Sequence, residues 1–306
     1  MKLTQVSFSE VIQGVAVGDA LGYPLEFMSN PRLSDLQAMV DAKDTLVVSD
    51  DTQMTLFLAE SLILGRCLWQ GYHQWFQTQT SPAPTDLQAK AETGLMRFIE
   101  MYIARAPGNT CMASAAKARS PHENNNSKGN GTVMRCTPIP YYGKSLGWDM
   151  DKVVAWAGTD AKVTHDHPFA RYASEVCCII HWLVLEGCTF YEAYREALAR
   201  SRDYGVSEEF LEHLTAVDTP HDYAAYKRNH DGWVAEEALA LAVGSVLHAR
   251  DFMQMISNAV VIAGDSDTVG AIAGGLAVLN GMTPPPELVS RLDLLKPIAY
   301  INTVFP

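Results

Sequence analysis

Two short stretches of the sequence place paired carboxylates beside hydroxyl side chains. SDDTQM occupies residues 49–54 and GDSDT occupies residues 264–268, so each stretch offers two aspartates and at least one hydroxyl within a few residues. Each stretch also stands at the start of a predicted helix whose following residues are strongly apolar. At helix starts, Ser, Asp and Thr are common caps, and acidic side chains interact favourably with the helix dipole. Capping explains one carboxylate in each stretch, but it does not explain the second.

A bound cation would give the second carboxylate of each stretch a role. Hard oxygens gathered from the first turns of two helices repel one another and demand a positive partner. Ligand sets made of oxygen alone select Mg²⁺, Mn²⁺ or Ca²⁺ and not zinc. Four aspartates suffice for two ions with shared bridging ligands, as in two-metal hydrolytic sites. The sequence therefore predicts a cation centre that uses Asp50, Asp51, Asp265 and Asp267.

Three further stretches hold polar side chains that could take part in chemistry: GDALGYPLE at 18–26, GNGTVMR at 129–135 and THDHP at 164–168. The glycines of GNG fit either a tight turn or a backbone that approaches a phosphate closely. Arg135 fits either a contact to an anion or a salt bridge at the edge of the core. His165 fits either a structural or a catalytic position. The residues alone leave these alternatives open.

Helical periodicity dominates the chain and must position these stretches. In residues 52–69, for example, Met54, Phe57 and Leu58 recur at spacings of three and four, whereas strict alternation of strands is nearly absent. No stretch resembles an interdomain linker, so we expect an all-α fold with residues 1–306 in a single domain. The pattern predicts helices at roughly residues 6–22, 52–69, 86–104, 147–159, 168–187, 189–201, 206–215, 232–249, 251–263 and 267–280.

Two of these helices carry glycines four residues apart, which predicts a close contact. Gly14 and Gly18 lie in the first helix, and Gly270 and Gly274 lie in the helix near the end of the chain. A glycine inside a helix costs about 1 kcal/mol relative to alanine. Close approach of the two backbones would compensate for that cost, so we expect both helices in the crowded centre of the fold.

Composition narrows the classes of partner. The chain of 306 residues has 23 basic and 35 acidic side chains, a net charge of −12, and no run rich in lysine or arginine. These numbers argue against a nucleic-acid partner held through its phosphates. An anionic ligand would need a local positive source, such as a metal, an arginine or helix ends.

The apolar stretches and the cysteines predict the cellular compartment of the protein. The longest apolar stretches, around 176–185 and 269–279, are too short to span a bilayer. The first residues, MKLTQVSFSE, contain no apolar segment typical of a signal peptide. Six cysteines without a C-x-x-C pair indicate free thiols in a reducing compartment. We therefore expect a cytoplasmic protein without a membrane span.

The five polar stretches, in their order along the chain, resemble the motif series of the ADP-ribosylglycohydrolase family, which includes dinitrogenase-reductase-activating glycohydrolases and ADP-ribosylarginine hydrolases. The match spans roughly residues 9–282. The resemblance implies a compact single-domain orthogonal helix bundle with two Mg²⁺ or Mn²⁺ ions at the base of an ADP-ribose cleft. It also implies ADP-ribose and ADP-ribosylated proteins as ligand and substrate.

The resemblance assigns roles to individual residues. It implies that the metal ligands are Ser49, Asp50, Asp51, Asp265, Asp267 and Thr268, with Ser49 in place of the usual threonine of the family. It implies that the catalytic residues are Glu26, Asp51 and Asp267, of which Glu26 is a mobile glutamate. It implies that the substrate-binding residues are Ser127, Gly129, Asn130, Gly131 and His165. Trp233, after Gly232, fits either a ligand-facing or a core position.

The expected reaction is hydrolysis of the glycosidic bond between C1″ of the distal ribose and a protein side chain. Arginine-linked ADP-ribose is the preferred substrate, because the PLE after GDALGY and the short chain favour the arginine-type branch. The alternatives are O-linked ADP-ribose (serine-linked or O-acetyl-ADP-ribose), a non-catalytic ADP-ribose-binding relative and a dinuclear phosphoester hydrolase. The metal and phosphate motifs are common to both linkage types, so they do not choose between them.

Overall fold

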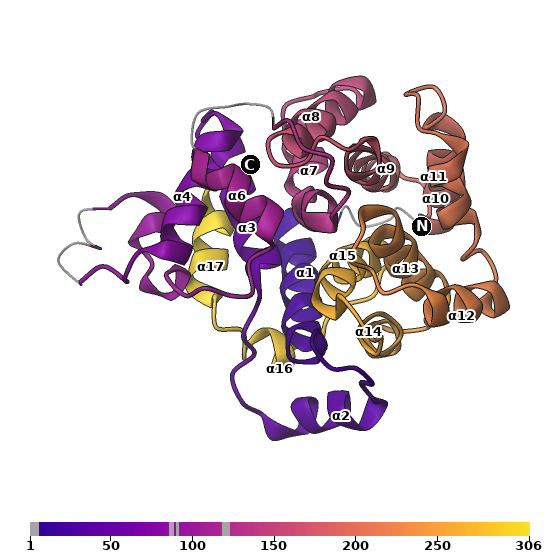
Figure 1. Cartoon of the computed structure of the whole chain (residues 1–306), viewed down its shortest axis with the longest axis horizontal. Coiled ribbons are helices and arrows are strands. Elements are labelled where there is room, and N and C mark those ends of the chain that lie inside the picture. The colour runs from indigo at the N-terminus through magenta and orange to yellow at the C-terminus, as the bar shows by residue number, and fades with distance from the viewer. Residues whose placement is uncertain (1–5, 86–88, 90–91, 118–122) are drawn as a thin grey trace.

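The chain folds as helices that cross one another at varied angles around a central pair (Figure 1). The computed structural model describes residues 6–85, 89, 92–117 and 123–306. In these residues there is no strand beyond two isolated bridges, Leu46 with Leu292 and Gly129 with Val234. The all-α prediction is confirmed.

The α-helices are α1 (Phe8–Gly22), α2 (Leu33–Ala42), α3 (Asp50–Ile63), α4 (Leu68–Thr80), α6 (Asn109–Lys117), α7 (Pro138–Ser145), α8 (Met150–Lys162), α9 (Pro168–Leu185), α10 (Phe190–Arg200), α11 (Glu208–Thr215), α12 (Pro220–Asn229), α13 (Ala235–Leu247), α14 (Phe252–Val260), α15 (Ser266–Leu279), α16 (Pro286–Val289) and α17 (Leu295–Val304). Short 3-10 helices connect some of them: η1 (Tyr23–Leu25), η2 (Gly94–Arg97), η3 (Ile99–Met101) and η4 (Asn130–Arg135).

Helices α1 and α15, from opposite ends of the chain, pack backbone to backbone. A Cβ atom on Gly14 would lie 2.4 Å from the carbonyl oxygen of Gly274, and one on Gly18 would lie 1.9 Å from that of Gly270. No side chain fits into such a gap, which explains why glycine stands at these positions. The predicted close approach is confirmed, and it aligns the C-terminal end of α1 with the first turn of α15.

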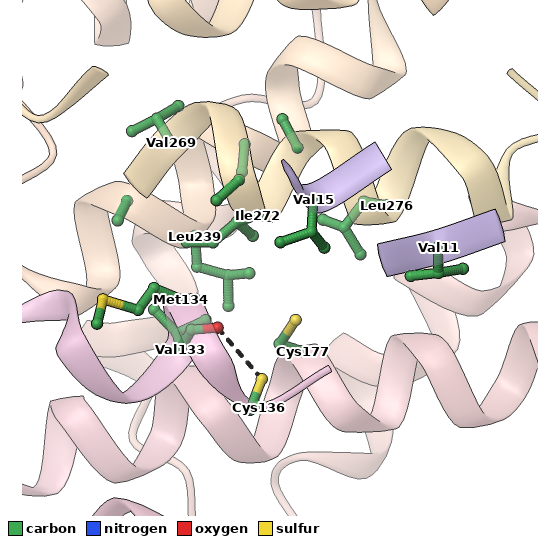
Figure 2. Close-up of a cluster of buried hydrophobic side chains, with 14 of the residues drawn as sticks. Val11, Val15, Val133, Met134, Cys136, Cys177, Leu239, Val269, Ile272 and Leu276 are labelled. Carbon is green, nitrogen blue, oxygen red and sulfur yellow. Dashed lines mark hydrogen bonds between the residues drawn. The ribbon is translucent and has the colours of Figure 1, made fainter. Parts of the chain in front are cut away.

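A hydrophobic core surrounds this pair. Figure 2 shows α1 and α15 above α9, with side chains from all three helices in one cluster. Each fully buried Val, Leu or Ile contributes roughly 1.5–3 kcal/mol to folding. The labelled members of this cluster, all buried, are Val11, Val15, Val133, Met134, Cys136, Cys177, Leu239, Val269, Ile272 and Leu276.

The long apolar stretches belong to this core. Residues 176–185 lie in α9 and residues 269–279 lie in α15. Among the described helices, none combines the length and the hydropathy needed to cross a membrane. The six cysteines are unpaired, and four of them, Cys111, Cys136, Cys177 and Cys178, are buried.

The predicted helices differ from the observed ones mainly at turns. The helix predicted for 52–69 ends early, because Gly65 adopts φ +60° and separates α3 from α4. The helix predicted for 86–104 is wrong over residues 92–104, which hold η2 and η3 and in which Gly94 adopts φ +63°. The remainder of that segment, 86–88 and 90–91, lies outside the described residues. The other predicted segments correspond to α1, α8, α9, α10, α11, α13, α14 and α15, while α2, α4, α6, α7, α12, α16 and α17 were not predicted.

Replacing Gly18 by alanine tests the α1–α15 contact. Because the new Cβ would overlap the carbonyl of Gly270, we expect the Gly18→Ala variant to lose about 3 kcal/mol of unfolding free energy, the upper end for overpacking. Denaturant unfolding measures this loss. Gly108→Ala is the matched control, since its Cβ would meet nothing nearer than the Cys111 sulfur at 4.0 Å. Equal stability of the two variants would contradict the proposed packing.

Candidate active site

The first acidic stretch lies at the start of α3, where a third aspartate anchors it. Ser49 caps the helix, and its hydroxyl accepts a hydrogen bond from the Asp51 N–H at 3.2 Å. The buried carboxylate of Asp19, on α1, accepts from the Ser49 N–H at 2.7 Å and from the Thr52 N–H at 3.0 Å. The Thr52 hydroxyl also donates to Asp19, at 2.5 Å. Asp19 therefore fixes the first turn of α3, which carries Asp50 and Asp51.

The loop before α6 holds the other side of this turn. The Asp50 N–H donates to the Arg105 carbonyl at 3.1 Å, and the Asp50 carboxylate accepts from the Gly108 N–H at 3.2 Å. The buried Arg105 guanidinium donates to the Val48 carbonyl at 2.8 Å and pairs with Asp293 at 2.5 Å. Asp50 is therefore held by backbone groups on both sides.

The second acidic stretch begins α15 after a turn that requires glycine. Gly264 adopts φ +153°, and a Cβ there would lie 2.1 Å from the Asp231 carbonyl oxygen. That same carbonyl accepts the Asp265 N–H at 2.8 Å. The Ser266 hydroxyl donates to the Gly22 carbonyl at 2.9 Å, which ties the first turn of α15 to the end of α1. Asp265 and Asp267 are thus placed by the α1–α15 contact.

The two acidic stretches meet. The Thr268 hydroxyl donates to the Asp51 carboxylate at 3.1 Å across a separation of 217 residues. This contact confirms the predicted convergence of the stretches. Carboxylate oxygens also lie within 4.8 Å of one another in two overlapping groups, one of Asp19, Asp51 and Asp267 and the other of Glu26, Asp265 and Asp267.

Burial makes these carboxylates weak acids. Burial raises the pKa of Asp19 from 3.8 to about 6. Burial, reinforced by the charges of Asp265 and Asp50, raises the pKa of Glu26 from 4.5 to about 8. The pKa values of Asp51 and Asp267 also rise well above 3.8, through burial first and neighbouring carboxylates second. The site favours either protons or a cation over free charge.

The donor set fits a hard divalent cation. Among the described residues, Glu26 Oε2 and Asp51 Oδ2 are buried and have no hydrogen-bond partner. A buried, unpartnered carboxylate oxygen is costly unless a cation or a donor compensates it. The remaining oxygens of the cluster come from other aspartates and from the Thr268 hydroxyl, so the set contains no nitrogen or sulfur ligand. Oxygen-only sets of this kind suit Mg²⁺, Mn²⁺ or Ca²⁺.

The acidic cluster opens into a cleft of about 530 Å³. The first turns of α3 and α15 line one part of it, and the loop at 106–108 with the first turn of α6 lines another. Ten of the predicted site residues line this cleft: Glu26, Asp50, Asp51, Gly129, Asn130, Gly131, His165, Asp265, Asp267 and Thr268.

The glycine-bearing turn at 129–131 is tied directly to the acidic cluster. The Asn130 side-chain amide donates to the Asp265 carboxylate at 2.7 Å and to the Gly232 carbonyl at 2.8 Å. A Cβ on Gly131 would lie 2.5 Å from the Cys111 sulfur, so the turn has no room for a larger residue there. The backbone of this turn therefore lies at the cleft in a fixed position.

The Arg135 side chain lies in the core and does not line the cleft. Its buried guanidinium pairs with Asp160 at 3.0 Å and lies over the Tyr72 ring at 4.3 Å from the ring centroid. It also donates to the Gly131 carbonyl at 2.6 Å and to the Thr164 hydroxyl at 2.9 Å. Of the two alternatives left open by the sequence, the salt bridge is the one observed. Through Gly131, Arg135 supports the turn from behind.

His165 lies beside this turn in a buried position. One ring nitrogen, Nδ1, is 2.8 Å from the Thr164 hydroxyl. Burial, with a smaller effect from the Arg135 charge, lowers the pKa of His165 to about 3, so the imidazole is neutral. His167, by contrast, caps α9 and accepts the Phe169 N–H at 3.1 Å. Only His165 faces the cleft.

Two predicted residues lie behind the cleft wall. The Ser49 hydroxyl caps α3, and the Ser127 hydroxyl accepts the Gly129 N–H at 3.4 Å and meets the Thr110 hydroxyl at 3.0 Å. Neither serine is among the residues that line the cleft. Both support backbone that does line it, and their roles as metal and substrate ligands stay predictions.

Sequence reasoning missed Asp19 and Phe27. Asp19 stands within GDALGYPLE, and its position one residue after Gly18 was the available signal. Phe27 follows Glu26 directly and lines the cleft together with Trp233. Trp233 therefore takes the ligand-facing alternative. No sequence pattern indicated that the loop at 106–108, where Ala106 adopts φ +49°, and the first turn of α6 would line the cleft.

Comparison with known proteins agrees with this geometry. The family model described as ADP-ribosylglycohydrolase matches residues 7–293. The chain belongs to the ADP-ribosylglycohydrolase family. Membership in this family supports the assignment of the protein as a hydrolase that removes ADP-ribose.

Individual relatives are distant but cover nearly the whole chain. The ADP-ribosyl-[dinitrogen reductase] glycohydrolase of Rhodospirillum rubrum is 26% identical, over 92% of this chain and 88% of the relative. An uncharacterized protein of Archaeoglobus fulgidus is also 26% identical, over 93% of this chain and 91% of its own. A solved structure titled ADP-ribosylglycohydrolase-related protein complex has 21% identity and a TM-score of 0.70, over 97% of this chain and 96% of that one, which shows the shared fold.

The raised pKa values predict how metal-free stability depends on pH. In EDTA, folded Asp19 and Glu26 keep protons, with pKa values of about 6 and about 8, that the unfolded chain loses near 3.8 and 4.5. The free energy of unfolding therefore falls as the pH rises from about 4 to about 8. Asp51→Asn removes one buried charge, so it should raise the melting temperature at pH 8 by roughly 2–4 °C, and by less at pH 5.

Differential scanning calorimetry in EDTA at both pH values measures this effect. Asp203→Asn is the matched control, because this aspartate is exposed and is not among the residues that line the cleft, and no shift in melting temperature is expected. A melting temperature of Asp51→Asn below that of the wild type at pH 8 would show that the carboxylate is not repelled in the metal-free site.

Proposed function

We propose that the protein hydrolyses the glycosidic bond between C1″ of the distal ribose of ADP-ribose and a protein side chain, with arginine as the preferred side chain. The observation that carries the proposal is the meeting of the two acidic stretches at the base of a cleft, marked by the Thr268–Asp51 hydrogen bond. Family membership supports the same reaction class. A cytoplasmic location is part of the proposal and is supported by the free cysteines.

Two Mg²⁺ or Mn²⁺ ions are the proposed cofactors. The residues that would hold them are Ser49, Asp50, Asp51, Asp265, Asp267 and Thr268, and Asp19 joins the same cluster. Such ions, when bound, supply positive charge against the carboxylates and the ligand and lower the pKa of a coordinated water. The unpartnered oxygens of Glu26 and Asp51 support this assignment.

The carboxylates at the base of the cleft would orient the attacking water and accept its proton. In the reaction, the bond from C1″ to the side-chain atom breaks, the oxygen of water bonds to C1″, and one proton passes to the leaving atom. The sugar develops oxocarbenium-like charge as that bond breaks, and neighbouring carboxylates stabilise it. Glu26, Asp51 and Asp267 line the cleft where this water must lie, so we assign them to orienting it and accepting its proton.

Neutral groups of the cleft accommodate the rest of ADP-ribose. The turn at Gly129–Gly131 and the first residues of α6 line the cleft, and a helix N-terminus favours the negative charge of a pyrophosphate. Neutral His165 beside this turn offers a hydrogen bond without adding charge. Because Asn130 bonds to Asp265, the position of this turn is set relative to the proposed catalytic carboxylates.

Loss of a cluster carboxylate should abolish turnover. Asp50→Ala and Asp267→Ala are each expected to reduce the release of ADP-ribose by at least about 100-fold, because each removes a proposed metal ligand. Chromatographic product analysis with arginine-linked and serine-linked substrates, in Mg²⁺ or in EDTA, measures it. Asp203→Ala should keep wild-type rates. Release of AMP or phosphate would indicate a phosphoesterase instead, and no product from either substrate would indicate a binding protein.

Divalent cations should stabilise the folded chain. A ligand that binds only the folded state adds about 2.7 kcal/mol at a free concentration of 100 Kd. We expect Mg²⁺ and Mn²⁺ to raise the melting temperature of the wild type and to have little effect on Asp267→Asn. Thermal unfolding with increasing metal, with Asp203→Asn as the control, checks this. An equal shift in wild type and Asp267→Asn would argue against the cluster as the binding site.

A further inference from the structure

Two aromatic side chains at the cleft remain unused by the proposed reaction. Phe27 is 75% exposed and Trp233 is 40% exposed, although most large apolar side chains of the described chain are buried. Their rings stack on each other, with centroids 6.5 Å apart and planes at 30°. Both line the cleft. Adjacent exposed aromatic faces that line a cleft are typical of a ligand-binding surface.

The pair belongs to one side of the acidic cluster. Phe27 follows Glu26, whose carboxylate groups with those of Asp265 and Asp267. Trp233 follows Gly232, whose carbonyl accepts the same Asn130 amide that donates to Asp265. The two rings and the Glu26–Asp265–Asp267 group therefore line the same cleft.

The charge of the cleft favours a cation at this place. The described lining residues include acidic and neutral side chains but no lysine or arginine. The nearby guanidinium of Arg135 is buried in a core ion pair. Carboxylates attract a cation by charge, and aromatic faces attract it through the ring quadrupole. A planar guanidinium satisfies both, because it can stack on a ring while it keeps its charge.

We propose that Phe27 and Trp233 form the recognition platform for the guanidinium of an ADP-ribosylated arginine. This inference rests on the proposed function and adds the residues that select the linkage. The leaving group is bonded to C1″ itself, so it must lie next to the carboxylates that act there. Serine-linked ADP-ribose and O-acetyl-ADP-ribose present a small neutral oxygen-linked group at this point, which gains neither the stacking nor the charge attraction.

Substitution of the aromatic rings tests the platform. The substrate is ADP-ribosylated agmatine, which carries the guanidinium without a protein. Phe27→Leu and Trp233→Leu are each expected to lower kcat/KM by about five- to twentyfold, mainly through KM, because each removes one cation–π contact. Trp233→Phe, which keeps an aromatic face, should retain most of the activity. Free ADP-ribose, measured as a competitive inhibitor, should bind all variants within about twofold of the wild type.

The matched control is Tyr191→Leu, an aromatic on α10 outside the cleft whose exposed fraction of 58% lies between those of Trp233 and Phe27. No change is expected for it. Weakened inhibition by ADP-ribose in Trp233→Leu would overturn the proposal, because it would show that the ring stacks on adenine. Unchanged kcat/KM in both leucine variants would also overturn it.

Comparison of substrates separates this inference from the proposed function. If the wild-type protein releases ADP-ribose from a serine-linked peptide but not from ADP-ribosylated agmatine, the proposed hydrolase activity is supported and the guanidinium platform is contradicted. Wild type that releases ADP-ribose from neither would refute the hydrolase itself.

Discussion

The mutual repulsion of carboxylates buried at one place governs this structure. Asp19, Asp50, Asp51, Asp265, Asp267 and Glu26 are all buried. Burial first, and the charge of neighbouring carboxylates second, raise the pKa values of Glu26, Asp50, Asp51 and Asp267. Part of this unfavourable charge is offset by fixed donors: backbone N–H groups at Ser49, Thr52 and Gly108, and the Asn130 amide. The unpartnered oxygens of Glu26 and Asp51 are not offset by any described protein group. A bound cation would compensate them, and it would give the acidic chain a positive centre for the proposed anionic ligand.

The glycine contact between α1 and α15 makes this arrangement possible. Asp19 lies one residue after Gly18, and the acidic turn of α15 lies just before Gly270. Since the two backbones touch at these glycines, the carboxylates on both helices are brought within a few ångströms of one another. A larger residue at either glycine would separate the helices and with them the two halves of the site. Packing at the centre of the fold and chemistry at the cleft therefore depend on the same contact.

Much of the site could be predicted from the sequence, because its residues occur in short local patterns. The paired aspartates, the GNG turn and the spaced glycines each carry a physical reason that can be read within a few residues. Phe27 and Arg105 could not be read in this way, since their roles depend on partners far along the chain, Trp233 and Asp293. Over residues 92–104 the helix prediction was wrong for a related reason: the periodicity continued through Gly94, whose positive φ turns the chain away from an α-helix.

The most direct test of the central claim is electron paramagnetic resonance of Mn²⁺ bound to the purified chain. Two spin-coupled ions per chain are expected in the wild type, because the ions of two-metal hydrolytic sites in general lie about 3.5–4 Å apart. The coupling should vanish in Asp51→Asn and Asp267→Asn, while Asp203→Asn should match the wild type. A wild-type chain that binds no Mn²⁺, or that binds it equally in the cluster variants, would contradict the claim that the buried carboxylates form a metal centre.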